Sequence, residues 1–156
     1  RRLRATVDSF RELKKPVTDE KQVERILSPD SDLHWKWRRK QAERIAGQMD
    51  LERFGVQGVY LIGSAKNYTA GPRSDIDLLI HFTGSDTQRE MLSAWLEGWS
   101  LALTELSFIH SGYRPAQGVL DVHIITDEDI RKRTSYAVMI GSLENSARPL
   151  KVRAGN

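Results

Sequence analysis

The chain alternates between segments with helical spacing of apolar residues and short runs rich in β-branched residues. Apolar positions that recur every three or four residues are typical of amphipathic helices, whereas short apolar runs are typical of buried strands. This spacing predicts helices over 3–14, 19–27, 33–53 and 87–108, and another that begins at 127. Strand patterns occupy 59–62, 75–82 and 119–125, with an edge strand at 149–152. The order predicts an α/β fold, in which a mixed β-sheet is flanked by helices.

Loop-forming residues divide these elements and suggest how the chain is organised. Pro16 separates the first two helices, and the polar stretch 28–32 precedes the third. We therefore expect residues 1–32 to form an N-terminal helical extension and residues 33–156 to form one compact domain. The acidic residues 127–129 stand where carboxylates stabilise a helix start, which favours capping over metal binding.

Composition narrows the class of protein. The chain has 156 residues, of which 39% are hydrophobic, enough for the core of a single domain. It contains no cysteine, so disulfides and thiolate-held zinc are excluded. No apolar run approaches the length of about 20 residues that spans a bilayer, and the cytoplasm is the expected location. Because the sequence begins with Arg1, we expect a domain of a longer protein.

Positive charge is concentrated near the N-terminus, although the net charge is only +3. The run 35–40 interleaves tryptophan with basic residues, a composition that can stack on bases and hold phosphates. Leu33, Trp37, Ile45 and Met49, however, recur at roughly helical spacing, which favours packing of Trp37 on the sheet. We expect packing, and we expect nucleic acid not to be the partner.

Two carboxylates lie close to a glycine turn. The apolar run 59–62 ends at Gly63-Ser64, where backbone N–H groups and a hydroxyl can contact phosphate oxygens. Asp75 and Asp77 are two residues apart, so on a strand they project from the same side while Ile76 and Leu78 face the opposite layer. Two anions held this close repel each other, and a divalent cation with hard oxygen ligands, Mg²⁺ or Mn²⁺, relieves the repulsion.

A third acid stands in a later strand. Asp121 interrupts an apolar run of β-branched residues, and a carboxylate there is costly unless it is paired or binds metal. The alternative is that Asp121 lies on a solvated strand face together with His123. Beside Asp75 and Asp77 we favour a shared metal site, in which His123 could lie next to the metal ligands or contact the nucleotide.

These residues together resemble the signature of the nucleotidyltransferase superfamily, which includes DNA polymerase beta, CCA-adding enzymes and the small minimal nucleotidyltransferases. The resemblance covers roughly residues 55–126 and rests on Gly63-Ser64, ten intervening residues, the Asp75–Asp77 pair and the later Asp121. It implies the nucleotidyltransferase fold, a nucleoside triphosphate substrate, which we expect to be ATP, and two divalent metal ions.

The resemblance also implies a role for each residue. Gly63 and Ser64 would contact the triphosphate, Asp75 and Asp77 would bind both metals, and Asp121 would complete the shell of one. Many minimal members carry an arginine soon after the Gly-Ser pair, whereas this chain has Lys66, which could supply the charge near the phosphates. Arg73 is better interpreted as a solvated loop charge.

A narrower similarity links the segments 63–67 and 96–99 to nucleotidyltransferase domains attached to large bacterial chains with a phosphoenolpyruvate synthase-like, pyruvate/phosphate dikinase-type region. We therefore expect transfer of a nucleoside monophosphate from the triphosphate to an acceptor hydroxyl, with release of pyrophosphate. The alternatives are a non-catalytic domain that senses nucleoside triphosphates for a larger enzyme, and an RNA-directed transferase that uses the basic segment.

Overall fold

A four-stranded mixed sheet forms the centre of the computed structural model, which describes residues 20–140 and 146–154. The strands are β1 (Val56–Ile62), β2 (Ile76–Phe82), β3 (Leu120–Ile125) and β4 (Arg148–Val152), in the order β3-β2-β1-β4. β1 pairs antiparallel with β2 and β4, whereas β2 pairs parallel with β3. The predicted α/β class and mixed sheet are confirmed.

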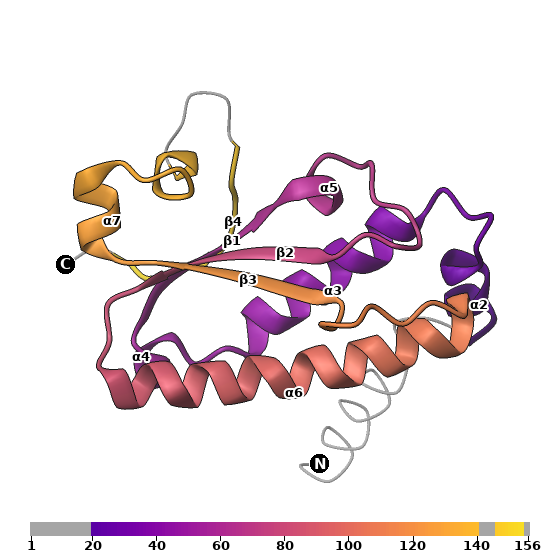
Figure 1. Ribbon diagram of the computed structural model, residues 1–156, viewed down its shortest axis with the longest axis horizontal. Coiled ribbons are helices and arrows are strands. Elements are labelled where there is room, and N and C mark those ends of the chain that lie inside the picture. The colour runs from indigo at the N-terminus through magenta and orange to yellow at the C-terminus, as the bar shows by residue number, and fades with distance from the viewer. Residues whose placement is uncertain (1–19, 141–145, 155–156) are drawn as a thin grey trace, which may run out of the picture.

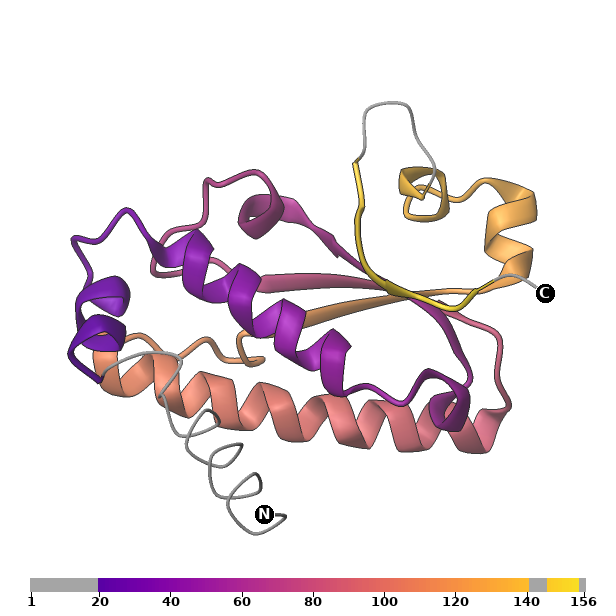
Figure 2. The same ribbon diagram turned by 180° about the vertical axis from the view of Figure 1, so that it is seen from behind.

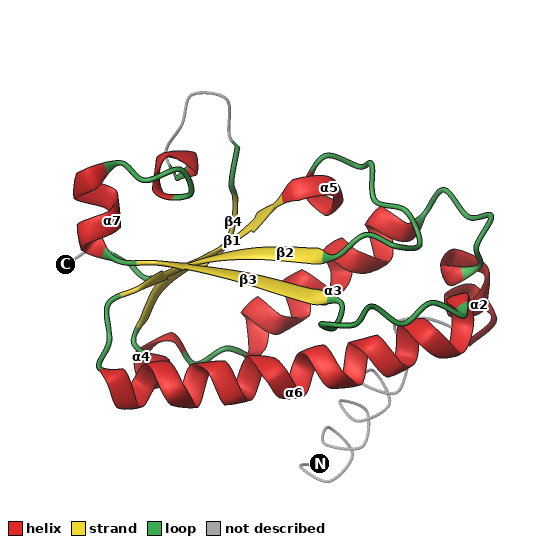
Figure 3. Ribbon diagram, viewed as in Figure 1, coloured by secondary structure: helices red, strands yellow, loops and turns green. Residues whose placement is uncertain are grey.

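The two long helices cover one face of this sheet. The helices are α2 (Glu20–Leu27), α3 (His34–Gln48), α4 (Leu51–Phe54), α5 (Gly63–Lys66), α6 (Asp86–Ser111) and α7 (Asp127–Lys132), with a 3₁₀ turn η1 (Ala137–Met139). Figures 1 and 2 show α3 and α6 on the same side of the sheet, while α7 and η1 lie on the other side. Figure 3 shows loops at both ends of the strands.

The period of two along each strand gives the sheet two different faces. Toward α3 and α6, strand β2 presents Ile76, Leu78 and Ile80, each 0% exposed, in one cluster with Trp37 of α3 and Leu92 of α6. The opposite face carries a smaller cluster, which consists of Tyr60, Ile62, Leu79, Ile125, Ala137 and Ala147. The burial of Ile76 and Leu78 was predicted from the alternation and is confirmed.

Some element bounds differ from the prediction. The single helix expected over 33–53 is two helices, because Met49 is extended and the side chain of Asp50 accepts a hydrogen bond from Arg53 N to begin α4. α4 ends at Gly55, whose φ of 67° is a left-handed conformation that glycine adopts at low cost. β1 starts directly after it, at Val56 instead of residue 59.

The N-terminal region is described only in part. The helix expected over 3–14 lies outside the described residues. The helix expected over 19–27 is present as α2, and Leu27 at its end is 0% exposed within the main core cluster. The division at residue 32 stays a prediction. No helix in the described ranges combines the length and apolarity needed to cross a membrane.

The basic run 35–40 lies on α3 and is partly buried. Trp37 is 5% exposed and belongs to the core, which confirms its predicted packing. Arg38 is 1% exposed, so it is not available for the RNA-binding surface that the sequence left open as an alternative. Its guanidinium is directed to backbone carbonyls in the loop before β2. The sequence pattern did not predict this burial.

We expect Trp37→Ala to lower the free energy of unfolding by about 3 to 5 kcal/mol, the cost of removing a buried aromatic side chain. Trp35 is the matched control, because it is only half-buried and packs edge-on against Tyr68 with ring centroids 4.7 Å apart. Trp35→Ala should cost about 1 kcal/mol. Urea unfolding followed by circular dichroism measures both. Equal losses would contradict the assignment of Trp37 to the core.

Candidate functional site

Strand register brings two of the predicted acids together. Asp77 of β2 pairs with Asp121 of β3 in the parallel ladder, and Ile62 of β1 pairs with Asp77 from the other side. Ile62, Asp77 and Asp121 therefore form one row across the sheet. The next row on the same face of the sheet, two residues along each strand, contains Tyr60, Leu79 and His123. Both rows lie on the face opposite to α3 and α6, which we call the open face.

Asp75 lies just before the strand that carries Asp77. It immediately precedes Ile76, the first residue of β2, so it is outside the strand in which it was predicted. Burial and the negative charge of Asp121 raise the pKa of Asp75, while the positive charge of Arg38 opposes the shift. Asp75 is thus electrostatically coupled to the acidic pair without being part of the ladder.

Asp77 bears the largest electrostatic cost in the cluster. Burial, followed by the charges of Asp121 and Asp75, raises the pKa of Asp77 to about 6. A pKa raised in this way means that the folded state penalises the ionised carboxylate. A cation bound among these groups would remove that penalty.

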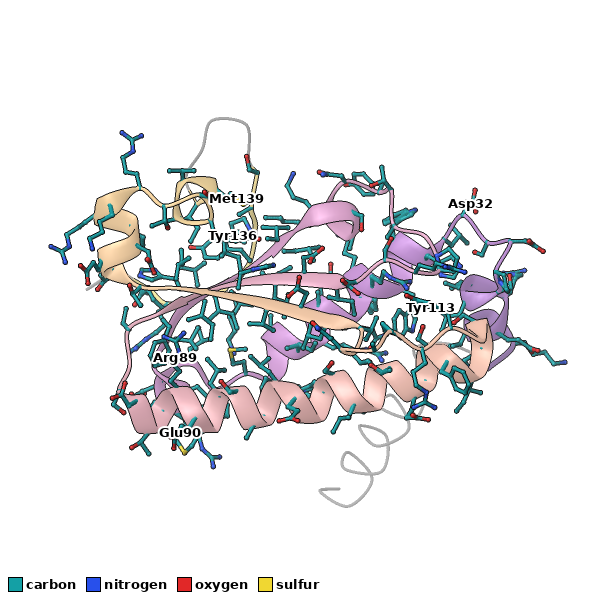
Figure 4. All side chains as sticks on the ribbon, in the orientation of Figure 1. Asp32, Arg89, Glu90, Tyr113, Tyr136 and Met139 are labelled. Atoms are coloured by element: carbon teal, nitrogen blue, oxygen red, sulfur yellow. The ribbon has the colours of Figure 1, made fainter. Side chains whose placement is uncertain are left out.

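His123 joins the acidic pair on the open face. Its Nε2 lies 3.3 Å from Oδ2 of Asp121, and its ring stacks on Tyr136 with centroids 4.1 Å apart. Figure 4 shows Tyr136 on the side of the sheet opposite α6. Among the residues that the structure describes, Asp77, Asp121 and His123 each offer one ligand atom, all within 4.8 Å of one another.

The predicted glycine turn lies against these acids. Gly63 has a φ of 72° and begins α5 directly after β1. A Cβ at this position would collide with the carboxylate of Asp77, so only glycine allows this close approach. Ser64 is the second residue of α5, and the first N–H groups of a helix have no acceptor within it.

The two basic residues near the turn differ in their surroundings. Lys66 ends α5, and its Nζ donates to Oδ1 of Asn67 at 3.2 Å. It lines a surface cavity of about 540 Å³ together with Tyr68 and Arg148. Arg73 is exposed, and its guanidinium lies 5.1 Å from the ring centroid of Tyr113, on the loop after α6 (Figure 4). This placement agrees with the interpretation of Arg73 as a loop charge.

The donor set fits a divalent cation. Carboxylate oxygens are the ligands that Mg²⁺ and Mn²⁺ prefer, whereas an imidazole nitrogen is more typical of other transition metals. The raised pKa of Asp77 shows that burial and the neighbouring acids disfavour its ionised form, and the carboxylate lies against the glycine turn, so a cation bound here would stabilise it. Asp127 belongs elsewhere: it is in the first turn of α7, as predicted, and pairs with His81 Nε2 at 2.7 Å.

A sheet with helices on one face and paired acids beside a Gly-Ser turn on the other is the architecture expected of a nucleotidyltransferase. The family model of the nucleotidyltransferase domain matches residues 39–153, which is most of the chain. The chain belongs to this family. No curated protein and no solved structure matches it.

Two residues of the site were not predicted. Tyr136 follows α7 at a position without a strand or helix pattern, and only the tertiary structure places it on His123. Arg38 could have been suspected, because it lies on the same helical face as His34, Ala42 and Ile45, which are all buried. A basic residue within an apolar stripe is a signal for a buried guanidinium.

We expect Asp77→Asn to stabilise the metal-free protein at neutral pH. The folded pKa of about 6 lies above the ordinary 3.8, so the cost is absent below pH 3.8, grows as pH rises between these values and is complete above pH 6. Because Asp77 is only half-buried, we expect a gain of about 1 to 2 kcal/mol at pH 7.5 and none at pH 3.5.

Urea unfolding in EDTA at both pH values measures this difference. The matched control is Asp32→Asn, in the exposed loop before α3, which should change stability little at either pH. Adding Mn²⁺ should stabilise the wild-type protein more than Asp77→Asn, since a ligand that binds only the folded state stabilises it. A stability gain that does not depend on pH would contradict the electrostatic origin.

Proposed function

We propose that this domain transfers a nucleoside monophosphate from a nucleoside triphosphate, ATP in the simplest case, to an acceptor hydroxyl and releases pyrophosphate. The observation that carries the proposal is the register of β2 and β3, which aligns Asp77 with Asp121 on the open face beside Gly63. Membership of the family supports transfer of a nucleotide in general.

Each residue has a distinct task in this proposal. Asp75 and Asp77 hold the metal ions, Mg²⁺ or Mn²⁺, and Asp121 completes the shell of one of them. Gly63 lets the carboxylate of Asp77 lie directly against the turn, and Ser64 donates to the phosphate oxygens of the triphosphate. Lys66, at the end of the same short helix, places positive charge near the phosphate tail.

Catalysis then depends mainly on orientation and charge. When bound, the metal ions supply charge that favours the ionised acceptor oxygen and neutralises the departing pyrophosphate. The carboxylates would hold this positive charge in a fixed place, and the acceptor oxygen would thereby be oriented in line with the α-phosphorus. That oxygen forms a bond to the α-phosphorus as the bond from this phosphorus to the pyrophosphate oxygen breaks. Asp121 is half exposed and is the carboxylate we assign to accept the proton of the hydroxyl.

The acceptor side of the open face is only partly enclosed. Among the described residues, the segment after β3 contributes α7 and η1 to this face. If the domain belongs to a larger enzyme, for instance one with a dikinase-type region, another part of that enzyme would provide the remaining wall. If the domain senses triphosphate without catalysis, it will bind the nucleotide and release no pyrophosphate.

Binding of ATP should require Mg²⁺ or Mn²⁺ and should weaken at least 10-fold in Asp75→Asn and in Asp77→Asn. Each substitution removes an anionic ligand with little change in side-chain size. Calorimetric titration with ATP, with and without EDTA, measures this affinity. Asp127→Asn is the matched control, because it removes a carboxylate that pairs with His81. Unchanged affinity in EDTA would exclude the metal site.

Asp121→Asn should retain most of the affinity for ATP but reduce the rate by about 100-fold or more. This pattern is expected when an interaction matters mainly in the transition state. Pyrophosphate release from radiolabelled triphosphates, with Mg²⁺ and a panel of candidate hydroxyl acceptors, measures the rate. A turnover equal to that of the wild type would return Asp121 to the role of a solvated strand residue.

A further inference from the structure

We propose that Arg38 is a positioning residue that orients the backbone leading into Asp75 and so places this carboxylate at the metal site. The inference rests on the proposed function, since it concerns one of the metal-binding acids. Arg38 precedes by one residue the region that the family model matches. It is therefore a feature of this chain that the family match does not describe.

Burial makes Arg38 unusual. The side chain is 1% exposed, and a guanidinium removed from water must have its N–H groups satisfied by acceptors. No carboxylate within the described ranges forms an ion pair with it at salt-bridge distance; its acceptors are backbone carbonyls and a histidine nitrogen. The hydrogen bonds of the guanidinium therefore hold backbone carbonyls in place.

Two of these hydrogen bonds cross from α3 to the loop before β2. Nε of Arg38 donates to the carbonyl of Ser74 at 2.8 Å, and Nη2 donates to the carbonyl of Pro72 at 3.2 Å. The carbonyl of Ser74 belongs to the peptide group that carries the N–H of Asp75. The planar guanidinium therefore fixes the orientation of the peptide at which Asp75 begins.

The other side of the guanidinium is held in turn by His34. Nη1 of Arg38 donates to the carbonyl of His34 at 3.2 Å and lies 3.3 Å from its Nδ1. Nε2 of His34 donates to the carbonyl of Ser28 at 2.8 Å, which leaves the lone pair of Nδ1 facing Arg38. Burial, the largest cause, lowers the pKa of His34; the hydrogen bond to Ser28 opposes this shift and the charge of Arg38 adds to it, so the neutral ring is favoured. A rigid chain of contacts thus supports the guanidinium.

Asp75 needs such support more than the other two acids do. Asp77 and Asp121 are held by the ladder between β2 and β3, whereas Asp75 precedes it. The ladder begins one residue later, where Ile76 N donates to the carbonyl of Val119 at 2.7 Å. Without Arg38, the peptide before Asp75 would lose the contact that ties it to α3.

Arg38 also contributes charge. Burial lowers the pKa of Arg38 to about 10, while the charge of Asp75 opposes the shift, so the side chain remains cationic at neutral pH. A lysine would keep this charge, but its ammonium cannot reproduce the flat fork that reaches both carbonyls. Arg38→Lys therefore removes the geometry of the guanidinium and keeps its charge, whereas Arg38→Met removes both.

The test is Mn²⁺ binding by the whole chain, measured from the electron paramagnetic resonance signal of free Mn²⁺. We expect Arg38→Met and Arg38→Lys each to weaken binding by about 10- to 100-fold, as substitutions that support metal ligands do. The matched control is Leu92→Ala, a fully buried core change on α6. It should lower thermal stability and leave Mn²⁺ affinity unchanged. If Arg38→Met does not fold, Arg38→Lys carries the test.

A double-mutant cycle identifies the route of the effect. In an Asp75→Asn background, Arg38→Lys should cause little further loss of Mn²⁺ affinity, because the two residues act through the same ligand. Additive losses, or full affinity in Arg38→Lys alone, would overturn the positioning role. If the wild-type chain binds no Mn²⁺, the proposed metal site fails as well. If the wild type binds Mn²⁺ and both Arg38 variants bind it as tightly as the wild type does, only this inference fails.

Discussion

The structure depends above all on the parallel pairing of β2 with β3 in the one register that aligns Asp77 with Asp121. A slip by one residue would turn every side chain of a strand to the opposite face. Ile76 and Leu78 would then lose their places in the core, and Asp77 would enter it. The same register therefore buries the apolar side chains and concentrates the acids on the open face.

The core is strong enough to hold this acidic cluster. Ile76, Leu78 and Ile80 are completely buried, and each contributes about 1.5 to 3 kcal/mol relative to an exposed position. The raised pKa of Asp77 indicates a smaller cost in the metal-free state. The apolar face thus outweighs the repulsion on the opposite face, and the domain can keep three carboxylates close together before any cation binds.

Helix α3 links the core to the loop that leads into the site. Trp37 and Ile45 anchor it in the core, while Arg38 of the same helix extends to the loop before β2. Its position is fixed by apolar packing, so the guanidinium reaches the backbone ahead of Asp75 from a rigid support. Stability and the geometry of the site are therefore linked through this one helix.

The sequence by itself determined the elements and the separation of the faces, because both follow from local spacing. The order of helix and strand patterns predicted the α/β sheet, and the Gly-Ser turn with Asp75, Asp77 and Asp121 predicted a cluster of acids, although Asp75 precedes β2 and the ladder pairs Asp77 with Asp121. The break at Met49-Asp50 was missed, although Asp50 and Gly55 carry local capping signals. Tertiary structure alone decided the two hydrogen bonds from Arg38 to carbonyls 34 and 36 residues away, and the stacking of Tyr136 on His123. A charged or aromatic side chain takes its role from groups that folding brings to it, and these groups leave no periodic pattern in the sequence.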